Sequence, residues 1–109
     1  MKTIEIKDWT DVSGSFTGIG IGINGDKYWF VNGKLHRPRE PACEYISGAK
    51  TWYIDGRLSR LDGPAYENGN GYCAWYIDGH NLTFEQFWEK QKDTIHAPRI
   101  MAYVLGAKK

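Results

Sequence analysis

Apolar and polar residues alternate along the first part of the chain, as they do in strands that lie half-buried in a sheet. Residues 3–7 read Thr-Ile-Glu-Ile-Lys, which places Ile4 and Ile6 on one face of a predicted strand. Residues 15–31 contain two strand-like runs separated by Asn24-Gly25, and an Asn-Gly pair between such runs is a strong hairpin signal. The N-terminal quarter therefore predicts a strand, a loop and a β-hairpin.

The first run of this hairpin alternates isoleucine with glycine. Gly18, Gly20 and Gly22 leave one face of the predicted strand without side chains. Two interpretations are possible. Either an aromatic side chain of a neighbouring element covers the glycines, or a ligand or partner approaches the bare backbone.

One phrase recurs at regular intervals from position 29 onward. Residues 52–56 read Trp-Tyr-Ile-Asp-Gly, residues 75–79 repeat them, and residues 29–33 read Trp-Phe-Val-Asn-Gly. Each phrase ends in Asx-Gly, which suits a type I′ turn, and a return strand comes after it. We therefore expect a mainly β fold, an antiparallel sheet of short β-hairpins with a 23-residue period.

The phrase also predicts two aromatic rows, because side chains alternate along a strand. One face is expected to carry the three tryptophans, with a β-branched residue beside each, as a shared spine. The opposite face is expected to carry Phe30, Tyr53 and Tyr76. This second row either packs against the terminal segments of the chain or stays exposed as a binding surface.

A helical pattern replaces the strand pattern near the C-terminus. Thr83 followed by Gln86 forms a capping box, and the apolar spacing predicts a helix over about residues 84–93 that closes the end of the sheet. Pro98 is expected to interrupt the chain beyond this helix. Residues 99–105 fit either a second helix or a final strand, and residues 106–109 are expected to form a tail.

Composition narrows the class of protein. The net charge is +1 with scattered Lys and Arg, so a nucleic-acid surface is not indicated, and no apolar run approaches the length of a membrane span. The N-terminus lacks the apolar core of a signal peptide, which favours the cytoplasm. Cys43 and Cys73 form no metal-binding motif with the three histidines, and we expect both to be packed thiols.

The repeated phrases carry a family resemblance. Residues 52–65 read Trp-Tyr-Ile-Asp-Gly-Arg-Leu-Ser-Arg-Leu-Asp-Gly-Pro-Ala, and residues 75–87 end in Leu-Thr-Phe-Glu-Gln-Phe. They resemble the repeats of a bacteriophage and large-virus family of MORN-like β-hairpin proteins, which run Trp-Tyr-x-Asn-Gly-x-x-His-Arg-x-Asp-Gly-Pro-Ala and commonly end in Leu-Thr-x-x-x-Phe and a helix. The match covers roughly residues 27–89.

Two departures stand out within the matched stretch. Residues 36–42 keep His-Arg but lose Asp-Gly, and Ser59 stands where the family has His. The resemblance implies a fold and a phage source but no activity. We accordingly divide a single domain into an N-terminal strand and hairpin (1–26), MORN-like repeats (27–82) and a C-terminal helical cap with its tail (83–109).

The sequence offers no residues for catalysis. Asp55, Asp62 and Asp78 each precede a glycine, where turn geometry requires Asx, and nucleophile and phosphate-loop motifs are missing. We therefore expect a protein that is not an enzyme and that uses no cofactor.

The basic residues of the repeats allow two interpretations. His36, Arg37 and Arg60 could form an anion-binding strip together with Lys34 and Arg57. Alternatively, each arginine pairs with a turn carboxylate such as Asp62 and shapes the fold.

Two functions remain open from the sequence. In the first, the row around Tyr53 and Tyr76, with Arg57 and Arg60 beside it, binds a host protein in the host cytoplasm and blocks it. A component of host defence is one candidate for this target. In the second, aromatic faces and arginines sequester a small anionic ligand such as a signalling nucleotide. Nucleic acid is a weaker candidate, no membrane partner is expected, and a homodimer through residues 3–7 or the glycine-rich strand is plausible.

Overall fold

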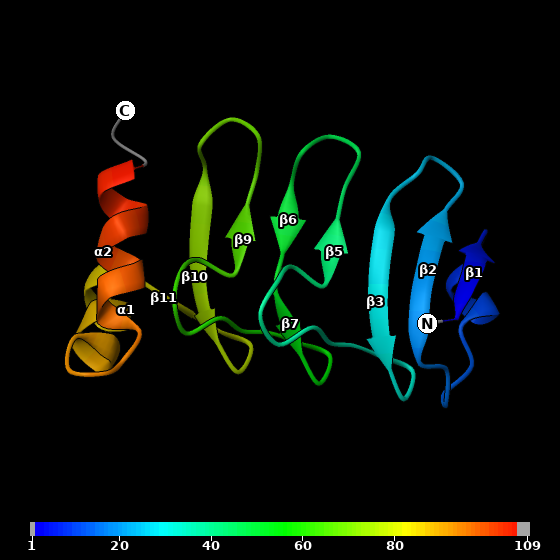
Figure 1. Ribbon diagram of the computed structural model, residues 1–109, viewed down its shortest axis with the longest axis horizontal. Coiled ribbons are helices and arrows are strands. Elements are labelled where there is room, and N and C mark those ends of the chain that lie inside the picture. The colour runs from blue at the N-terminus through cyan, green and yellow to red at the C-terminus, as the bar shows by residue number, and fades with distance from the viewer. Residues whose placement is uncertain (1, 107–109) are drawn as a thin grey trace.

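The computed structural model describes residues 2–106 and is mainly β, as expected (Figure 1). In chain order the elements are β1 (Thr3–Ile6), the short 3-10 helix η1 (Trp9–Asp11), β2 (Gly18–Gly22), β3 (Lys27–Val31), β4 (Lys34–Leu35), β5 (Cys43–Glu44), β6 (Lys50–Thr51), β7 (Tyr53–Ile54), β8 (Arg57–Leu58), β9 (Tyr66–Glu67), β10 (Cys73–Ile77), β11 (His80–Leu82), α1 (Phe84–Gln91) and α2 (Ala97–Gly106).

Most strands lie side by side in one long sheet, in the order β1-β2-β3-β5-β6-β9-β10-β11 (Figure 1). Strand β4 pairs with β3 beside this order, and β7 and β8 form a separate two-stranded sheet. The strand predicted at residues 3–7 and the hairpin of β2 and β3 are both confirmed. The sheet is mixed, however, and not wholly antiparallel as predicted, because β1 pairs with β2 in parallel. The loop that carries η1 returns the chain to the starting end of β1, so β2 must run in the same direction.

Three Asx-Gly turns close the short hairpins β3–β4, β7–β8 and β10–β11. Asn32, Asp55 and Asp78 have φ values of 50°, 51° and 50°, and the glycine after each also has positive φ. Two successive positive φ angles define the type I′ turn that the sequence predicted. The N–H of Gly56 donates to the carbonyl of Leu35 at 2.8 Å, and that of Gly79 donates to Leu58 at 2.7 Å, so each of these two turns is bonded to the preceding hairpin.

The glycine face of β2 is covered by side chains of its neighbours. Ile6, Phe16 and Phe30 form a buried cluster there, with exposed fractions of 8% or less. A methyl group added at Gly20 would collide with Ile6 and Phe30. The interpretation in which an aromatic neighbour covers the glycines is therefore confirmed, and the backbone is not open to a ligand.

Two helices, not one, complete the C-terminus. The capping box is confirmed, since Gln86 N–H donates to the Thr83 hydroxyl at 3.1 Å and the Thr83 N–H donates to Gln86 at 2.9 Å. The undecided segment is the helix α2, and Pro98 lies in its first turn, where the missing N–H breaks no hydrogen bond. The predicted tail falls mostly on residues 107–109, outside the described residues.

The terminal segments cover opposite faces at opposite ends of the sheet. Near the N-terminus, Trp9 packs edge-on against Tyr28 and Phe30. Near the C-terminus, Phe87 and Ile100 of the two helices are fully buried and pack with Trp75 on the other face. On the face that carries Tyr53 and Tyr76, neither hydrophobic cluster reaches the middle of the sheet.

Candidate functional site

Tyrosine side chains gather on one face of the sheet. Directly opposite residues share a face, and the register places one residue from each of five strands in a row: Tyr28, Cys43, Thr51, Tyr66 and Ala74. Tyr53 lies two positions after Thr51 and Tyr76 two positions after Ala74, so both share this face. We call the following residues the tyrosine face: Tyr45, Tyr53, Tyr66, Tyr72 and Tyr76.

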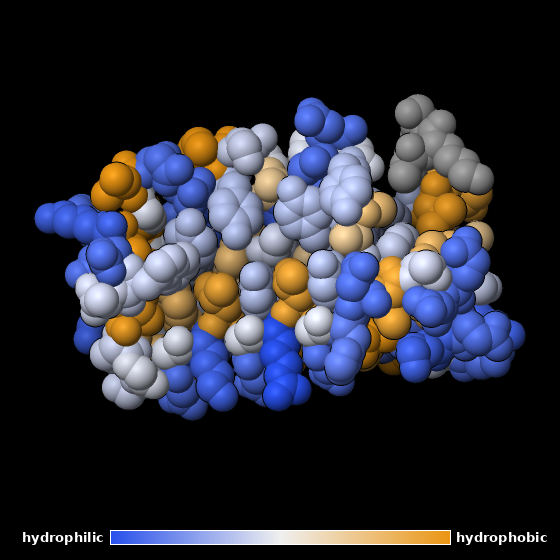
Figure 2. All heavy atoms as spheres, turned by 180° about the vertical axis from the view of Figure 1, so that it is seen from behind, coloured by the Kyte–Doolittle hydropathy of each residue, from blue (hydrophilic) through white to orange (hydrophobic). Residues whose placement is uncertain are grey.

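The tyrosine face is partly open to solvent, since Tyr72 is exposed and the other four tyrosines are half-buried. Tyr72 is 62% exposed, and its ring meets that of Tyr66 at a centroid distance of 5.8 Å, while Tyr45 meets Tyr28 at 6.0 Å. Figure 2 shows pale, ring-shaped residues and hydrophobic residues across the middle of the molecule, with many hydrophilic residues along the lower margin. This is an extended, shallow surface of amphipathic rings.

The floor beneath the rings is buried and uncharged. Cys43 is 1% exposed, and burial raises the pKa of its thiol. Burial also raises the pKa of Tyr53, and that of Tyr28 to about 12. Among buried side chains of residues 2–106, the hydroxyl of Thr51 has no hydrogen-bond partner. The rings therefore rest on a floor that carries no charged side chain.

Phe30 does not belong to this surface. It is 4% exposed and packs in the N-terminal cluster, so it supports the fold and does not face a partner. Neither hydrophobic cluster of the described residues includes Tyr53 or Tyr76. The predicted aromatic row is thus divided: its first member is covered by the N-terminal segment, and the other two remain half-buried on an open face.

Arg60 lies on the opposite face and is held by the fold. Its guanidinium stacks on the ring of Trp52 at 3.8 Å and donates to Asp62 at 2.9 Å and Glu67 at 3.3 Å. It also donates to the carbonyl of Pro64 at 3.1 Å. The charge of Arg60 is therefore already paired.

The same contacts recur one repeat earlier in the chain. Arg37 stacks on Trp29 at 3.8 Å and donates to Glu40 at 3.0 Å and Glu44 at 3.4 Å. The tryptophans do not stack on one another; arginine side chains cover Trp29 and Trp52, and aromatic side chains of the helices cover Trp75. Arg37 and Arg60 therefore pair with carboxylates within the fold, as in the second interpretation of the basic residues.

Asp62 holds a second arginine as well. Its carboxylate accepts hydrogen bonds from Arg60 at 2.9 Å and from Arg99 of α2 at 3.2 Å. Burial alone would raise the pKa of Asp62, but these hydrogen bonds and charges outweigh it and lower the pKa. This carboxylate ties helix α2 to the sheet and neutralises part of the positive charge there.

His36 and Arg57 also lie apart from the tyrosine face. The Nδ1 atom of His36 accepts a hydrogen bond from the N–H of Asp55 at 3.0 Å, and the hydroxyl of Ser59 does the same for Asp78 at 3.1 Å. Ser59 thus makes the bond equivalent to that of His36 one repeat earlier. Arg57 is exposed beside the third turn, with its Cβ next to Gly79.

A groove of about 590 Å³ lies on the tryptophan side, between α2 and the loop after Arg37. Trp52, Ile54 and Ile77 line its floor, and Arg39 and Arg99 stand at its rim. Arg39 has no ion-pair partner within the described residues. This groove is the nearest match to a small-ligand pocket, but Arg60 and Arg99 are already paired with the carboxylates of Asp62 and Glu67.

Sequence reasoning found two of the five tyrosines. Tyr45, Tyr66 and Tyr72 lie in turns or short strands outside the repeated phrase, and only the register of β5, β6 and β9 brings them beside Tyr53. Period-two alternation after Cys43 would have placed Tyr45, and the same alternation counted back from Tyr76 through Ala74 would have placed Tyr72.

The acidic partners of the arginines were also missed. Glu44 accepts from Arg37 and Glu67 accepts from Arg60, and each glutamate stands at the same offset from its arginine. The repeat spacing that relates the two arginines therefore relates the two glutamates as well, and this is the signal that could have found them.

Within residues 2–106, no group of three or more His, Cys, Asp or Glu side chains could hold a metal ion. No described helix is long and apolar enough to span a bilayer.

Comparison of the chain with models of protein families, with curated proteins and with solved structures finds no match.

Proposed function

We propose that this protein is a non-enzymatic phage accessory protein that binds a host protein through the tyrosine face and blocks it, with a component of host defence as the target. The observation that carries the proposal is the open row of five tyrosines across the middle of the sheet. Tyrosine is enriched at binding hot spots because its ring buries apolar area while its hydroxyl remains able to hydrogen-bond. A shallow surface of this kind suits a folded partner better than a small molecule.

We also propose that the sheet is built from MORN-like hairpin repeats, which is the basis for the phage source. Support comes from the contacts that recur with the period of the sequence. The Trp–Arg stack, the arginine bond to a proline carbonyl and the side-chain bond to the next turn each occur twice in equivalent positions. A repeat architecture requires that the contacts between residues recur together with the amino-acid sequence.

The binding surface differs from the one expected from sequence alone. Tyr53 and Tyr76 remain in it, and Tyr45, Tyr66 and Tyr72 join them. The arginines belong to the opposite face, so the tyrosine face binds without a charged partner residue at its centre. We therefore expect weak dependence of binding on salt.

Affinity capture from host lysate tests the proposal with matched variants. The double variant Tyr53→Ala/Tyr76→Ala removes two rings from the tyrosine face, and Arg39→Ala changes an exposed residue on the other side. We expect one stoichiometric host protein with the wild type and with Arg39→Ala. Loss of each hot-spot tyrosine should weaken binding by about 30-fold, so the double variant should capture none. Undiminished capture by the folded double variant would refute the tyrosine face as the site.

A second candidate is sequestration of a small anionic ligand in the groove above Trp52, which Arg39 favours because its charge is unpaired there. Native mass spectrometry of the protein as purified from cells distinguishes the two functions. A bound mass of a few hundred daltons that Arg39→Ala abolishes would support the ligand. Unliganded protein together with a captured host protein would reject it.

A further inference from the structure

The first strand leaves one edge of the sheet unpaired. Among the described residues, β1 pairs with a single strand, β2. The N–H of Ile19 donates to the carbonyl of Lys2 at 2.8 Å, which shows that Lys2 and the residues two and four positions later turn their backbone groups toward β2. The backbone N–H and C=O groups of Thr3 and Glu5 must therefore point outward, away from the sheet.

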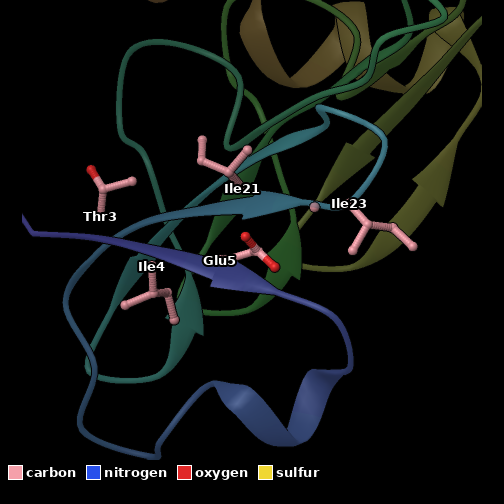
Figure 3. Close-up of a pocket in the computed structure, with 6 residues that line it drawn as sticks. Thr3, Ile4, Glu5, Ile21 and Ile23 are labelled. Carbon is pink, nitrogen blue, oxygen red and sulfur yellow. The ribbon is translucent and has the colours of Figure 1, made fainter.

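The next outward group is already capped. The N–H of Lys7 donates to the carboxylate of Asp11 at 2.8 Å, so the edge that can accept a new strand ends at Ile6. The available edge is short and contains two residues with free donors and acceptors, Thr3 and Glu5. A shallow hollow of about 400 Å³ lies against β1 and the end of β2, and Thr3, Glu5 and Ile23 line part of it (Figure 3). Ile23 is 79% exposed.

We infer that β1 pairs in antiparallel fashion with β1 of a second copy of this chain, with Thr3 of one copy opposite Glu5 of the other. In this register the two residues exchange both backbone hydrogen bonds, and the two-fold axis repeats them, which gives four bonds between the copies. Ile4 then faces Ile4 across the axis at a non-hydrogen-bonded position, where Cα atoms are roughly 4.5 Å apart.

Charge favours this register over the one shifted by two residues that pairs Glu5 with Glu5. Moving one strand by two residues would place Glu5 opposite Glu5, and like charges directly opposite each other are destabilising. The inferred register instead places Glu5 opposite a threonine, and it brings Lys2 opposite Ile6, next to the acidic turn that contains Asp8 and Asp11 of the other copy. A second copy therefore complements this edge in both hydrogen bonding and charge.

The pairing closes at two copies. The other end of the sheet is formed by the short strand β11, and the two helices lie there (Figure 1). Each copy thus contributes one open edge, which yields a dimer and not a fibre. Because the two-fold axis is perpendicular to the sheet, the tyrosine faces of both copies lie on the same side of the dimer. The dimer would then bind its partner bivalently. That consequence rests on the proposed function, whereas the dimer itself does not.

Cysteine crosslinking tests the register. In the full-length protein, Ile4→Cys should form a covalent dimer under mild oxidation, because its Cα separation across the axis lies in the range for a disulfide. A mixture of Thr3→Cys and Glu5→Cys chains should crosslink to each other more than either does alone. The wild type, whose Cys43 is buried and whose Cys73 lies in β10, is the control and should remain monomeric on a denaturing gel.

Two measurements without cysteines make the test independent of those variants. Sedimentation of the wild type from about 1 to 500 μM should show a concentration-dependent dimer, since a four-bond strand pairing buries less area than a tight interface needs. Glu5→Pro removes an outward N–H and leaves the β2 bonds intact, so it should fold normally and remain monomeric. Hydrogen exchange at the Glu5 amide should slow with concentration, while the Ile4 amide, which faces β2, should not change.

Three results would overturn the inference: a monomer across the whole concentration range, a dimer that persists in Glu5→Pro, or preferential crosslinking in a different register.

Discussion

Replacement of Arg60 tests whether the stacked arginines hold the sheet together. The side chain is 19% exposed, covers Trp52 and donates to two carboxylates and one carbonyl. Arg60→Ala removes all of these contacts and leaves Glu67 without its partner. The stacking is worth about 1–2 kcal/mol in a partly desolvated site, and a hydrogen bond to a charged group about 1.5–3 kcal/mol.

These terms overlap, and Asp62 keeps its bond to Arg99. We therefore expect Arg60→Ala to lower the free energy of unfolding by about 3 kcal/mol, near the lower end of the cost of breaking a buried ion pair. For a domain of this size that corresponds to a melting temperature lower by about 12–20 °C. Urea unfolding followed by tryptophan fluorescence measures the free energy, and a thermal melt with the same signal measures the temperature.

Two matched variants separate the contributions. Arg37→Ala removes the equivalent contacts of the preceding repeat, but the Arg37 partners Glu40 and Glu44 are 64% and 37% exposed, so we expect a loss of about 2 kcal/mol. Arg60→Lys keeps the charge and loses the planar fork, and we expect an intermediate loss. A loss below about 1 kcal/mol for Arg60→Ala, or a lysine variant as stable as the wild type, would refute the structural role of the guanidinium.

Three further predictions concern single polar groups. Thr51→Val replaces the unpartnered buried hydroxyl by a methyl group of similar shape, so stability in urea should stay equal or rise by up to about 1 kcal/mol, and a clear loss would mean that the hydroxyl has a partner. Ser59→Ala leaves the N–H of Asp78 without its acceptor and should cost about 1–2 kcal/mol in the same assay, whereas Ser59→Asn should restore part of it. The pKa of Tyr28 is raised to about 12, so the neutral ring contributes stability that is complete below pH 10 and is lost as the pH rises from about 10 to 12. Absorbance at 295 nm should show that Tyr28→Phe removes a late-titrating tyrosine of the folded protein, and early titration of every tyrosine would contradict the raised pKa.

Much of the local structure can be predicted from the sequence. The Asx-Gly pairs demand positive φ, the capping box at Thr83 begins a helix, and the alternation at Ile4 and Ile6 makes a strand, because each signal acts within a few residues. The recurring phrase likewise places the tryptophans on one face and Tyr53 on the other. The alternation of glycine with isoleucine predicted a bare face on β2, but only the structure showed that Ile6, Phe16 and Phe30 cover it.

The positions that decide function depend on pairing between distant segments. The sequence could not show that β1 runs parallel to β2, since that depends on the path of the loop that carries η1. The sequence pattern predicted Arg60 beside Tyr53. In the structure the guanidinium of Arg60 stacks on the ring of Trp52, where carboxylates neutralise its charge. The repeated phrase predicted equivalent positions for Phe30 and Tyr53. In the structure the N-terminal segment covers only the first hairpin, so Phe30 is buried.

Local signals in the chain therefore account for the hairpins, the alternation of faces and the identity of the aromatic rows. Which row is buried, which charges are already paired and which edge is left open were settled by the folded arrangement alone. Burial and ion pairing depend on contacts between residues far apart in the chain, and periodicity carries no information about where a terminal segment folds back.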